Sequence, residues 1–222
     1  MRRRFSWEEL LPVEETRAAT AFMIEVWKKA SSANPKDFKY SAREPDLTGM
    51  LTYYLHQLGA DGRILGFWNA ETQMPRKRGI GRLSRTRKDL SYQSNLSGGR
   101  LDLTFEFKKI TTSNLGAYRG DGGMKRFVDG DYAIGKPLAF MVGISRPGDM
   151  APIKHLRRSL MNKATQRVLR MVRDGSGRYL VEPSEAVPGF CQFDTEHNRP
   201  RGKAPAHGTI TLGHIFLECP SS

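Results

Sequence analysis

Residues 100–109 constrain the fold more than any other part of this chain of 222 residues. Apolar residues take every second position there: Leu101, Leu103, Phe105 and Phe107. A period of two is typical of a β-strand with one face in the core, because successive side chains point to opposite faces. The opposite face, which we expect to be exposed, carries Asp102, Glu106 and Lys108. Two carboxylates and an ammonium on one face can hold a divalent cation and a phosphate together, and a solvated face with a cross-strand ion pair is an equally good interpretation.

Two amphipathic helices are expected before this strand, over residues 14–33 and 44–58. Both segments repeat apolar residues at spacings of three and four. In the second, Pro45 fits the first helical position and Gly59 supplies the stop. Glu44 falls on the same stripe as the buried leucines, so we expect its carboxylate to point toward the core. A carboxylate placed there needs a cation or a metal ion.

Residues 138–144 form an unbroken apolar run, typical of a strand buried on both faces. Further strands are expected at residues 63–71, 178–182, 189–195 and 209–217, and further helices at residues 124–134 and 151–173. This alternation predicts an α/β fold with a mixed central sheet flanked by helices. We expect an N-terminal helical extension over residues 1–40 and one compact domain over residues 41–222.

The net charge of +13 and an isoelectric point near 10 indicate a polyanionic partner, of which nucleic acid is the commonest. Residues 76–88, expected to be a loop, concentrate cations without any acid: Arg76, Lys77, Arg78, Arg82, Arg85, Arg87 and Lys88. Phosphate contact is the favoured interpretation of that loop. The expected helix over residues 151–173 is also rich in cations, either as a solvated face or as a nucleic-acid surface.

The chain starts without the apolar core of a signal peptide, and no apolar run approaches the ~18 residues of a spanning helix. We therefore expect a cytoplasmic protein without a membrane partner. The two cysteines, Cys191 and Cys219, are expected to be reduced.

A helix-borne acid, then strands carrying Asp and Glu-x-Lys, then a helix and a buried strand, resembles the order of the PD-(D/E)xK nuclease superfamily. Residues 123–144 and 197–217 also look like uncharacterised bacterial proteins of this restriction-endonuclease-like group. The resemblance implies a Mg²⁺- or Mn²⁺-dependent endonuclease with Glu44, Asp102 and Glu106 as metal ligands, and Lys108 orienting the attacking water. It also implies DNA rather than RNA as substrate, a role in prokaryotic restriction or antiviral defence, and a homodimer or a partner subunit of a defence complex.

The chemistry of phosphodiester hydrolysis agrees with this resemblance. Hard Mg²⁺ held by carboxylates neutralises the phosphate and activates water, whereas the histidines and cysteines lack the spacing of zinc ligands. One difficulty is that Asp102 and Glu106 would lie ~13 Å apart on a regular strand. A bulge or a distorted strand start, Glu71 as the true second ligand, or a degenerate site would each resolve it.

Additional phosphate contacts are expected from Lys125 and Arg126, and from His197 and Arg199 in a basic turn, although isolated strand histidines such as His197 and His214 are more often structural. The alternative function is a non-catalytic DNA- or RNA-binding subunit with a degenerate nuclease fold. A ribosome- or RNA-associated protein is a weaker third option, because aromatic residues do not interleave with the basic clusters.

Overall fold

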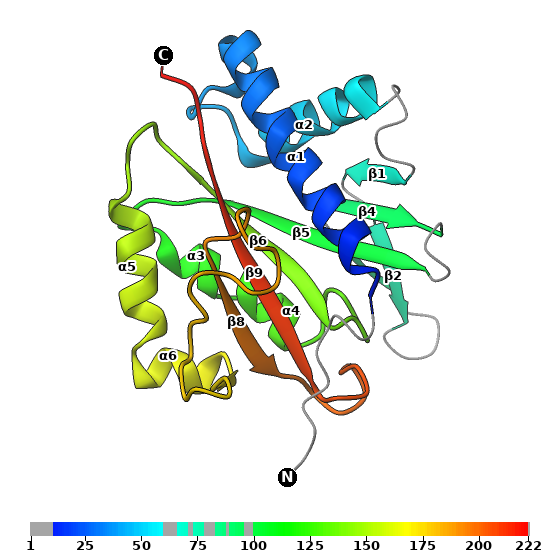
Figure 1. Cartoon of the computed structure of the whole chain (residues 1–222), viewed down its shortest axis with the longest axis vertical. Helices are drawn as coiled ribbons and strands as arrows, with labels where there is room; N and C mark the ends of the chain where they lie inside the picture. Colours follow the sequence, from blue (N-terminus) through cyan, green and yellow to red (C-terminus); the bar gives the residue numbers. More distant parts are fainter. Residues whose placement is uncertain are drawn as a thin grey trace.

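The computed structural model describes residues 11–59, 66–70, 73–77, 83–87, 89–95 and 100–221, with the backbone alone for 73–77 and 83–87. These residues form an α/β protein built on a seven-stranded mixed sheet of order β1-β4-β5-β6-β9-β8-β7 (Figure 1). The sequence-based prediction of a mixed central sheet flanked by helices is confirmed. The strands of this sheet are β1 (Phe67–Ala70), β4 (Leu90–Ser94), β5 (Leu101–Lys109), β6 (Leu138–Ser145), β7 (Met171–Val172), β8 (Phe193–Asn198) and β9 (Thr209–Glu218).

The helices belong to two groups that cover opposite faces of the sheet. The first group consists of α1 (Val13–Ala33), the 3-10 helix η2 (Pro35–Phe38) and α2 (Glu44–Gly59). The second consists of α3 (Leu115–Arg119), α4 (Met124–Val128), α5 (Ala151–Leu160) and α6 (Lys163–Val168). The helices predicted over residues 14–33 and 44–58 are therefore confirmed. The predicted buried strand is also confirmed, since every residue of β6 is buried.

Strand β5 lies between β4, to which it pairs antiparallel, and β6, to which it pairs parallel. Strand β9 continues the parallel part on the other side of β6. The carboxyl ends of β5, β6 and β9 consequently share one edge of the sheet, the edge at which open α/β sheets usually bind ligands. Glu106 and Lys108 lie near this end of β5.

Two hydrophobic clusters, one on each face of the sheet, make up the core. The first joins α1 and α2 to the apolar side chains of β5 and β6. The second joins α3, α4 and α5 to the opposite face of the sheet. The polar face of β5 is therefore not exposed as we expected: Thr104 and Glu106 retain 0% and 1% of their exposure. Because the second helical group covers this face, Glu106 is a buried acid.

Several segments differ from the sequence-based expectation. Residues 151–173 are not one helix, because Asn162 accepts a hydrogen bond from the Ala164 amide and begins α6 as a separate helix. Residues 178–182 form only one isolated bridge, between Val181 and Asp194. The strand expected at 189–195 is shifted to Phe193–Asn198, and α3 was not predicted from the sequence.

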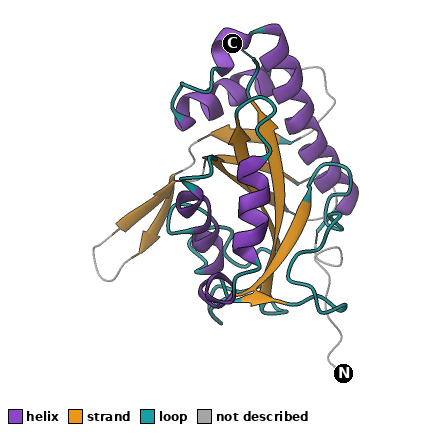
Figure 2. Cartoon of the chain, turned by 90° about the vertical axis from the view of Figure 1, so that its left-hand side faces the viewer, coloured by secondary structure: helices purple, strands orange, loops and turns teal. Residues whose placement is uncertain are grey.

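The basic residues 76–88, which we expected to form a loop, overlap two strands. Strand β2 (Gln73–Lys77) pairs antiparallel with β3 (Leu83–Arg87) in a separate two-stranded sheet. Figure 2 shows these two strands projecting away from the body of the molecule.

Cys191 and Cys219 are both buried and unpaired, as expected. Among the helices that the structure describes, none has the length and apolar character needed to cross a membrane.

Candidate active site

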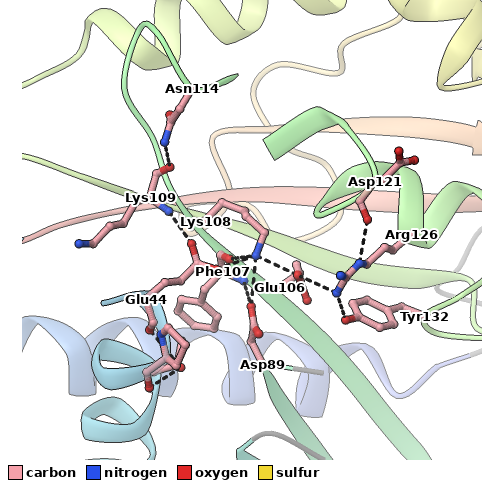
Figure 3. Close-up of polar contacts among 12 residues, drawn as sticks. Glu44, Asp89, Glu106, Phe107, Lys108, Lys109, Asn114, Asp121, Arg126 and Tyr132 are labelled. Atoms are coloured by element: carbon pink, nitrogen blue, oxygen red, sulfur yellow. Dashed lines mark hydrogen bonds and ion pairs between the residues drawn. The ribbon is translucent and has the colours of Figure 1, made fainter. Parts of the chain in front are cut away.

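The ammonium of Lys108 lies among oxygens supplied by three separate parts of the chain (Figure 3). Its Nζ donates to Glu44 Oε1 at 2.7 Å and to the Phe107 carbonyl at 2.6 Å. The same nitrogen is 3.0 Å from Glu106 Oε1 and 3.7 Å from Asp89 Oδ2. We call Glu44, Asp89, Glu106 and Lys108 the carboxylate–lysine cluster.

Glu44 enters the cluster because it is the first residue of α2. The buried leucines of that helix pack on the sheet and orient its start: Leu47, Leu51 and Leu55. Glu44 Oε1 accepts from Lys108, and its Oε2 accepts from the backbone amide of Lys109 at 3.0 Å. The prediction that this carboxylate points inward toward a cation is confirmed, and the cation is Lys108.

Asp89, which was not predicted from the sequence, supplies the second carboxylate. It immediately precedes β4, and the pairing of Leu90 with Phe105 places Asp89 beside Glu106. Its Oδ2 accepts from the backbone amide of Phe107 at 2.9 Å. The sequence did contain a signal for this strand, because Leu90 and Tyr92 are apolar and alternate with polar residues just after the basic residues 76–88.

Asp102 does not enter the cluster. The β4–β5 pairing runs without interruption from Leu101 to Phe105, so the bulge that would bring Asp102 toward Glu106 is absent from that ladder. At ~3.3 Å per residue the two Cα atoms are ~13 Å apart. The Asp102 carboxylate instead lies 3.9 Å from Lys136 Nζ. Asp102 therefore does not join Glu44, Glu106 and Lys108 as expected, and Asp89 occupies the place beside Glu106 that was expected for it.

Burial and the charges of neighbouring groups shift the pKa values of three side chains in the cluster. Burial, followed by the neighbouring charge of Asp89, raises the pKa of Glu106 to about 8. Burial also raises the pKa of Asp89, although Lys108 opposes the shift. Burial lowers the pKa of Lys108, but the three carboxylates outweigh it and raise that pKa overall. The ammonium therefore stays charged, and Glu106 keeps a proton at neutral pH.

A second cation, Arg126 of α4, approaches Glu106 from the opposite side to Glu44 in Figure 3. Its Nη1 is 3.7 Å from Glu106 Oε1 and donates to the Tyr132 hydroxyl. Its Nε donates to the Asp121 carbonyl at 2.8 Å. Burial, followed by the charge of Glu106, raises the pKa of Tyr132 to about 12. Arg126 was predicted as a phosphate contact, and the structure puts it beside the cluster.

The other predicted contacts are placed differently. Lys125 forms an ion pair with Asp121 at 2.6 Å. His197 is fully buried and its ring nitrogens contact the Leu169 carbonyl and the Thr195 hydroxyl. Arg199 is buried as well and donates to the carbonyls of residues 132 and 133. The expectation that His197 and Arg199 contact phosphate is therefore corrected: His197 lies on the interior strand β8, and Arg199, just after it, is held by backbone carbonyls.

Some of the predicted site residues are not described by the structure. Arg78, Arg82, Lys88 and Glu71 lie outside the described residues, and the side chains of Arg76, Lys77, Arg85 and Arg87 are likewise not described. Their contacts with phosphate or with a metal ion stay predictions.

The carboxylate oxygens of the cluster are the ligand type that a hard divalent cation prefers, but the three carboxylates are not arranged to bind one ion together. Across the described residues, no group of three or more histidines, cysteines or acids is arranged to hold a metal ion. Both oxygens of Glu44 are engaged by Lys108 and Lys109. Glu106 Oε2, by contrast, is buried without a hydrogen-bond partner. Asp89 and Glu106 are thus the acids whose oxygens fit an ion best, whereas Glu44 contacts Lys108 and Lys109, and its metal role stays a prediction.

Comparisons of this chain with family models, with curated proteins and with solved structures each find no match.

Proposed function

We propose that this chain is a divalent-metal-dependent nuclease that hydrolyses phosphodiester bonds, with DNA as the favoured substrate, on a restriction-endonuclease-like α/β fold. The observation that carries the proposal is the convergence of Glu44, Asp89, Glu106 and Lys108 at the carboxyl end of a central strand. This is a helix-borne acid, an acid beside the neighbouring strand and a Glu-x-Lys pair, the pattern of the PD-(D/E)xK superfamily. Asp89 takes the position that was predicted for Asp102.

Asp89 and Glu106 are the residues that would hold the cation. The charge of the half-buried Asp89 acts on the buried Glu106, which after burial is a cause of the raised pKa of Glu106. Its unpaired Oε2 supports the assignment further, because a buried oxygen without a partner is costly. When bound, a divalent ion would neutralise charge on the phosphate and activate a water molecule.

Lys108 and Arg126 supply the fixed positive charge of the site. Glu44 holds the Lys108 ammonium in place through its Oε1, so that the lysine can donate a hydrogen bond to a water or to a phosphate oxygen. Arg126 lies on the other side of Glu106, and its guanidinium suits bidentate contact with a phosphate. The net charge of +13 supports a polyanionic substrate.

The test is cleavage of a supercoiled plasmid and of a matched RNA with Mg²⁺, with Mn²⁺ and with a chelator. We expect metal-dependent cleavage of DNA by the wild type and its loss in Glu106→Gln, which keeps the side-chain shape. Metal-dependent cleavage that survives Glu106→Gln would sink the assignment of the site. Preferential cleavage of the RNA would overturn the choice of substrate.

A second candidate function is a non-catalytic nucleic-acid-binding subunit with the same fold. One observation favours it: Lys108 already balances the carboxylates, and the described residues include no ready three-ligand metal group. Its signature would be salt-sensitive DNA binding without turnover under any divalent ion. The cleavage experiment therefore decides between the two candidates.

A further inference from the structure

A separate cleft of about 690 Å³ opens at the same edge of the sheet. Its walls come from η2 and the residues just after it, from the turn after β6 and from the chain after β9: Pro35, Lys36, Lys39, Tyr40, Ser41, Arg146, Pro147, Pro220 and Ser221. The carboxyl edge of parallel strands is where α/β sheets bind ligands. The volume lies within the range of pockets that take small organic ligands.

The lining combines positive charge with flat apolar walls. Lys36, Lys39 and Arg146 are exposed cations, and none of the described lining residues is acidic. Three prolines and the half-buried ring of Tyr40 supply the apolar surface. The Arg146 guanidinium lies 5.3 Å from the centre of the Tyr40 ring. A guanidinium plane and an aromatic ring are the surfaces on which nucleobases stack.

The cleft is tied to the carboxylate–lysine cluster through Lys109. The Lys109 ammonium donates to the carbonyls of Tyr40 and Ala42, and the Tyr40 hydroxyl donates to the Ile110 carbonyl at 3.2 Å. The backbone amide of Lys109 donates to Glu44, which holds Lys108. Lys109 of β5 thus holds the wall of the cleft in place, and the residue before it, Lys108, belongs to the cluster.

We propose that this cleft binds one nucleotide unit, with the base against Tyr40, Arg146 and the prolines, and the phosphate against Lys36 and Lys39. This inference rests on the proposed function insofar as the nucleotide belongs to the substrate strand. The apolar walls account for a base and the cations account for a phosphate, whereas inorganic phosphate alone would leave the ring and the prolines unused. The same chemistry serves a nucleotide within a strand and a free nucleotide that regulates the enzyme.

The experiment measures binding of deoxyadenosine 5′-monophosphate to the full chain by calorimetry, in chelator so that no cleavage occurs. We expect saturable binding, and weaker binding of deoxyadenosine and of inorganic phosphate measured alone. Arg146→Gln and Tyr40→Leu should each weaken nucleotide binding by about tenfold, the loss expected on removal of one charge-assisted or stacking contact. Arg167→Gln on α6 is the matched control for charge and should leave binding unchanged.

Two variants keep the proposal falsifiable if Tyr40→Leu disturbs folding, because Arg146 is exposed and does not belong to the core. Absence of nucleotide binding by the wild type, or binding that neither variant weakens, overturns the proposal. Displacement of the nucleotide by a short single-stranded oligonucleotide assigns the cleft to the substrate strand. Undisturbed binding in the presence of that oligonucleotide assigns it to a free nucleotide.

The failure of this inference is distinguishable from failure of the proposed function. Glu106→Gln should abolish cleavage and retain nucleotide binding, because Glu106 does not line the cleft. Nucleotide binding without any cleavage by the wild type therefore supports the cleft and rejects the nuclease. If the wild type cleaves DNA but does not bind the nucleotide, and Arg146→Gln cleaves with an unchanged KM, the cleft proposal is rejected and the nuclease proposal is retained.

Discussion

The carboxylate of Asp89 accepts a hydrogen bond from the backbone amide of Phe107 at 2.9 Å, which holds it 3.7 Å from the Lys108 ammonium. The amide belongs to the residue that separates the glutamate from the lysine. The pairing of β4 with β5, together with this backbone amide, therefore fixes the position of Asp89 in the cluster. Asp89 is positioned by the sheet and needs no metal ion to stay in place.

Asp89→Asn should lower metal-dependent cleavage by about 100-fold or more, the loss typical of removing one preorganised electrostatic group from a site. The amide side chain keeps the shape and the Phe107 contact but removes the negative charge. The measurement is the initial rate of plasmid nicking in Mg²⁺ or Mn²⁺. Asp102→Asn is the matched control on the same face of β5 and should change the rate by less than about threefold. Equal losses in the two variants would contradict the replacement of Asp102 by Asp89.

Sequence periodicity placed part of this site correctly. The helical periodicity of residues 44–58 depends only on residues close together in the chain, so the sequence alone indicates which side of the helix carries Glu44. The alternation of residues 101–107 likewise puts Glu106 and Lys108 on one face. Local patterns carry no register between strands, however, and Asp89 reaches Glu106 only through the pairing of Leu90 with Phe105. The alternation after Asp89 can indicate the strand, whereas the contact of this acid with the cluster depends on the register between strands.

The burial of the polar face of β5 was equally inaccessible. It results from α3 and α4, which have five residues each. Helix α3 was not predicted, and the helix predicted over residues 124–134, which α4 forms in part, gave no indication of the strand that it covers. For the same reason His197 was assigned to a surface turn, although its strand is paired on both sides by β7 and β9. The layers of an α/β fold can be predicted from sequence, whereas the depth of a particular polar side chain depends on contacts distant along the chain.

Glu106→Gln should abolish cleavage and at the same time make stability less dependent on pH. The folded protein keeps Glu106 protonated up to a pKa of about 8, whereas an unfolded glutamate ionises near 4.5. The stability contributed by this raised pKa is complete below pH ~4.5 and is lost as the pH rises toward 8. The glutamine variant lacks this loss, so it should gain stability relative to wild type between pH 5 and pH 8, by on the order of 1.4 kcal/mol per pKa unit.

Urea unfolding of both proteins at pH 5 and pH 8 measures this difference. Glu106→Ala is the useful comparison, because it removes the same carboxyl group but leaves a cavity. It should be less stable than the glutamine variant at both pH values. A stability difference between wild type and Glu106→Gln that stays constant across this range would contradict the raised pKa.

Lys108→Met should make the folded protein depend on a divalent ion. The substitution keeps the length of the side chain but removes the ammonium that balances the charges of Glu44 and Asp89 beside the buried Glu106. We expect a lower Tm in chelator, and a larger increase in Tm on adding Mn²⁺ than in wild type, because an ion that binds only the folded state stabilises it.

Differential scanning calorimetry with and without Mn²⁺ tests this expectation. Lys136→Met is the matched control, since Lys136 lies 3.9 Å from Asp102, outside the cluster. Its response to Mn²⁺ should equal that of wild type. A Lys108→Met protein that Mn²⁺ does not stabilise more than wild type would argue against Asp89 and Glu106 as cation ligands.

A buried chain of hydrogen bonds, remote in sequence from the cluster, should make the protein sensitive to acid. The Leu169 carbonyl can only accept, so His197 Nδ1 donates to it and His197 Nε2 accepts from the Thr195 hydroxyl. The Thr195 oxygen in turn accepts from His214 Nε2. The Tyr118 hydroxyl lies 2.9 Å from His214 Nδ1 and 3.3 Å from the Met141 carbonyl, and it donates to Nδ1 when His214 is neutral.

Burial lowers the pKa of His197 to about 4, and burial together with the field of His197 lowers the pKa of His214. Unfolded histidines titrate near 6.5, so between pH 6.5 and pH 4 the unfolded chain binds protons that the folded chain does not. The free energy of unfolding should therefore fall as the pH falls through this window, by up to about 1.4 kcal/mol per pH unit for each histidine. His214→Gln should reduce that slope by about one proton, whereas His155→Gln, at an exposed position of α5, should leave it unchanged. Urea unfolding measured at half-unit steps from pH 7 to pH 4.5 gives the slope, and an equal slope in wild type and His214→Gln would exclude the buried chain as its source.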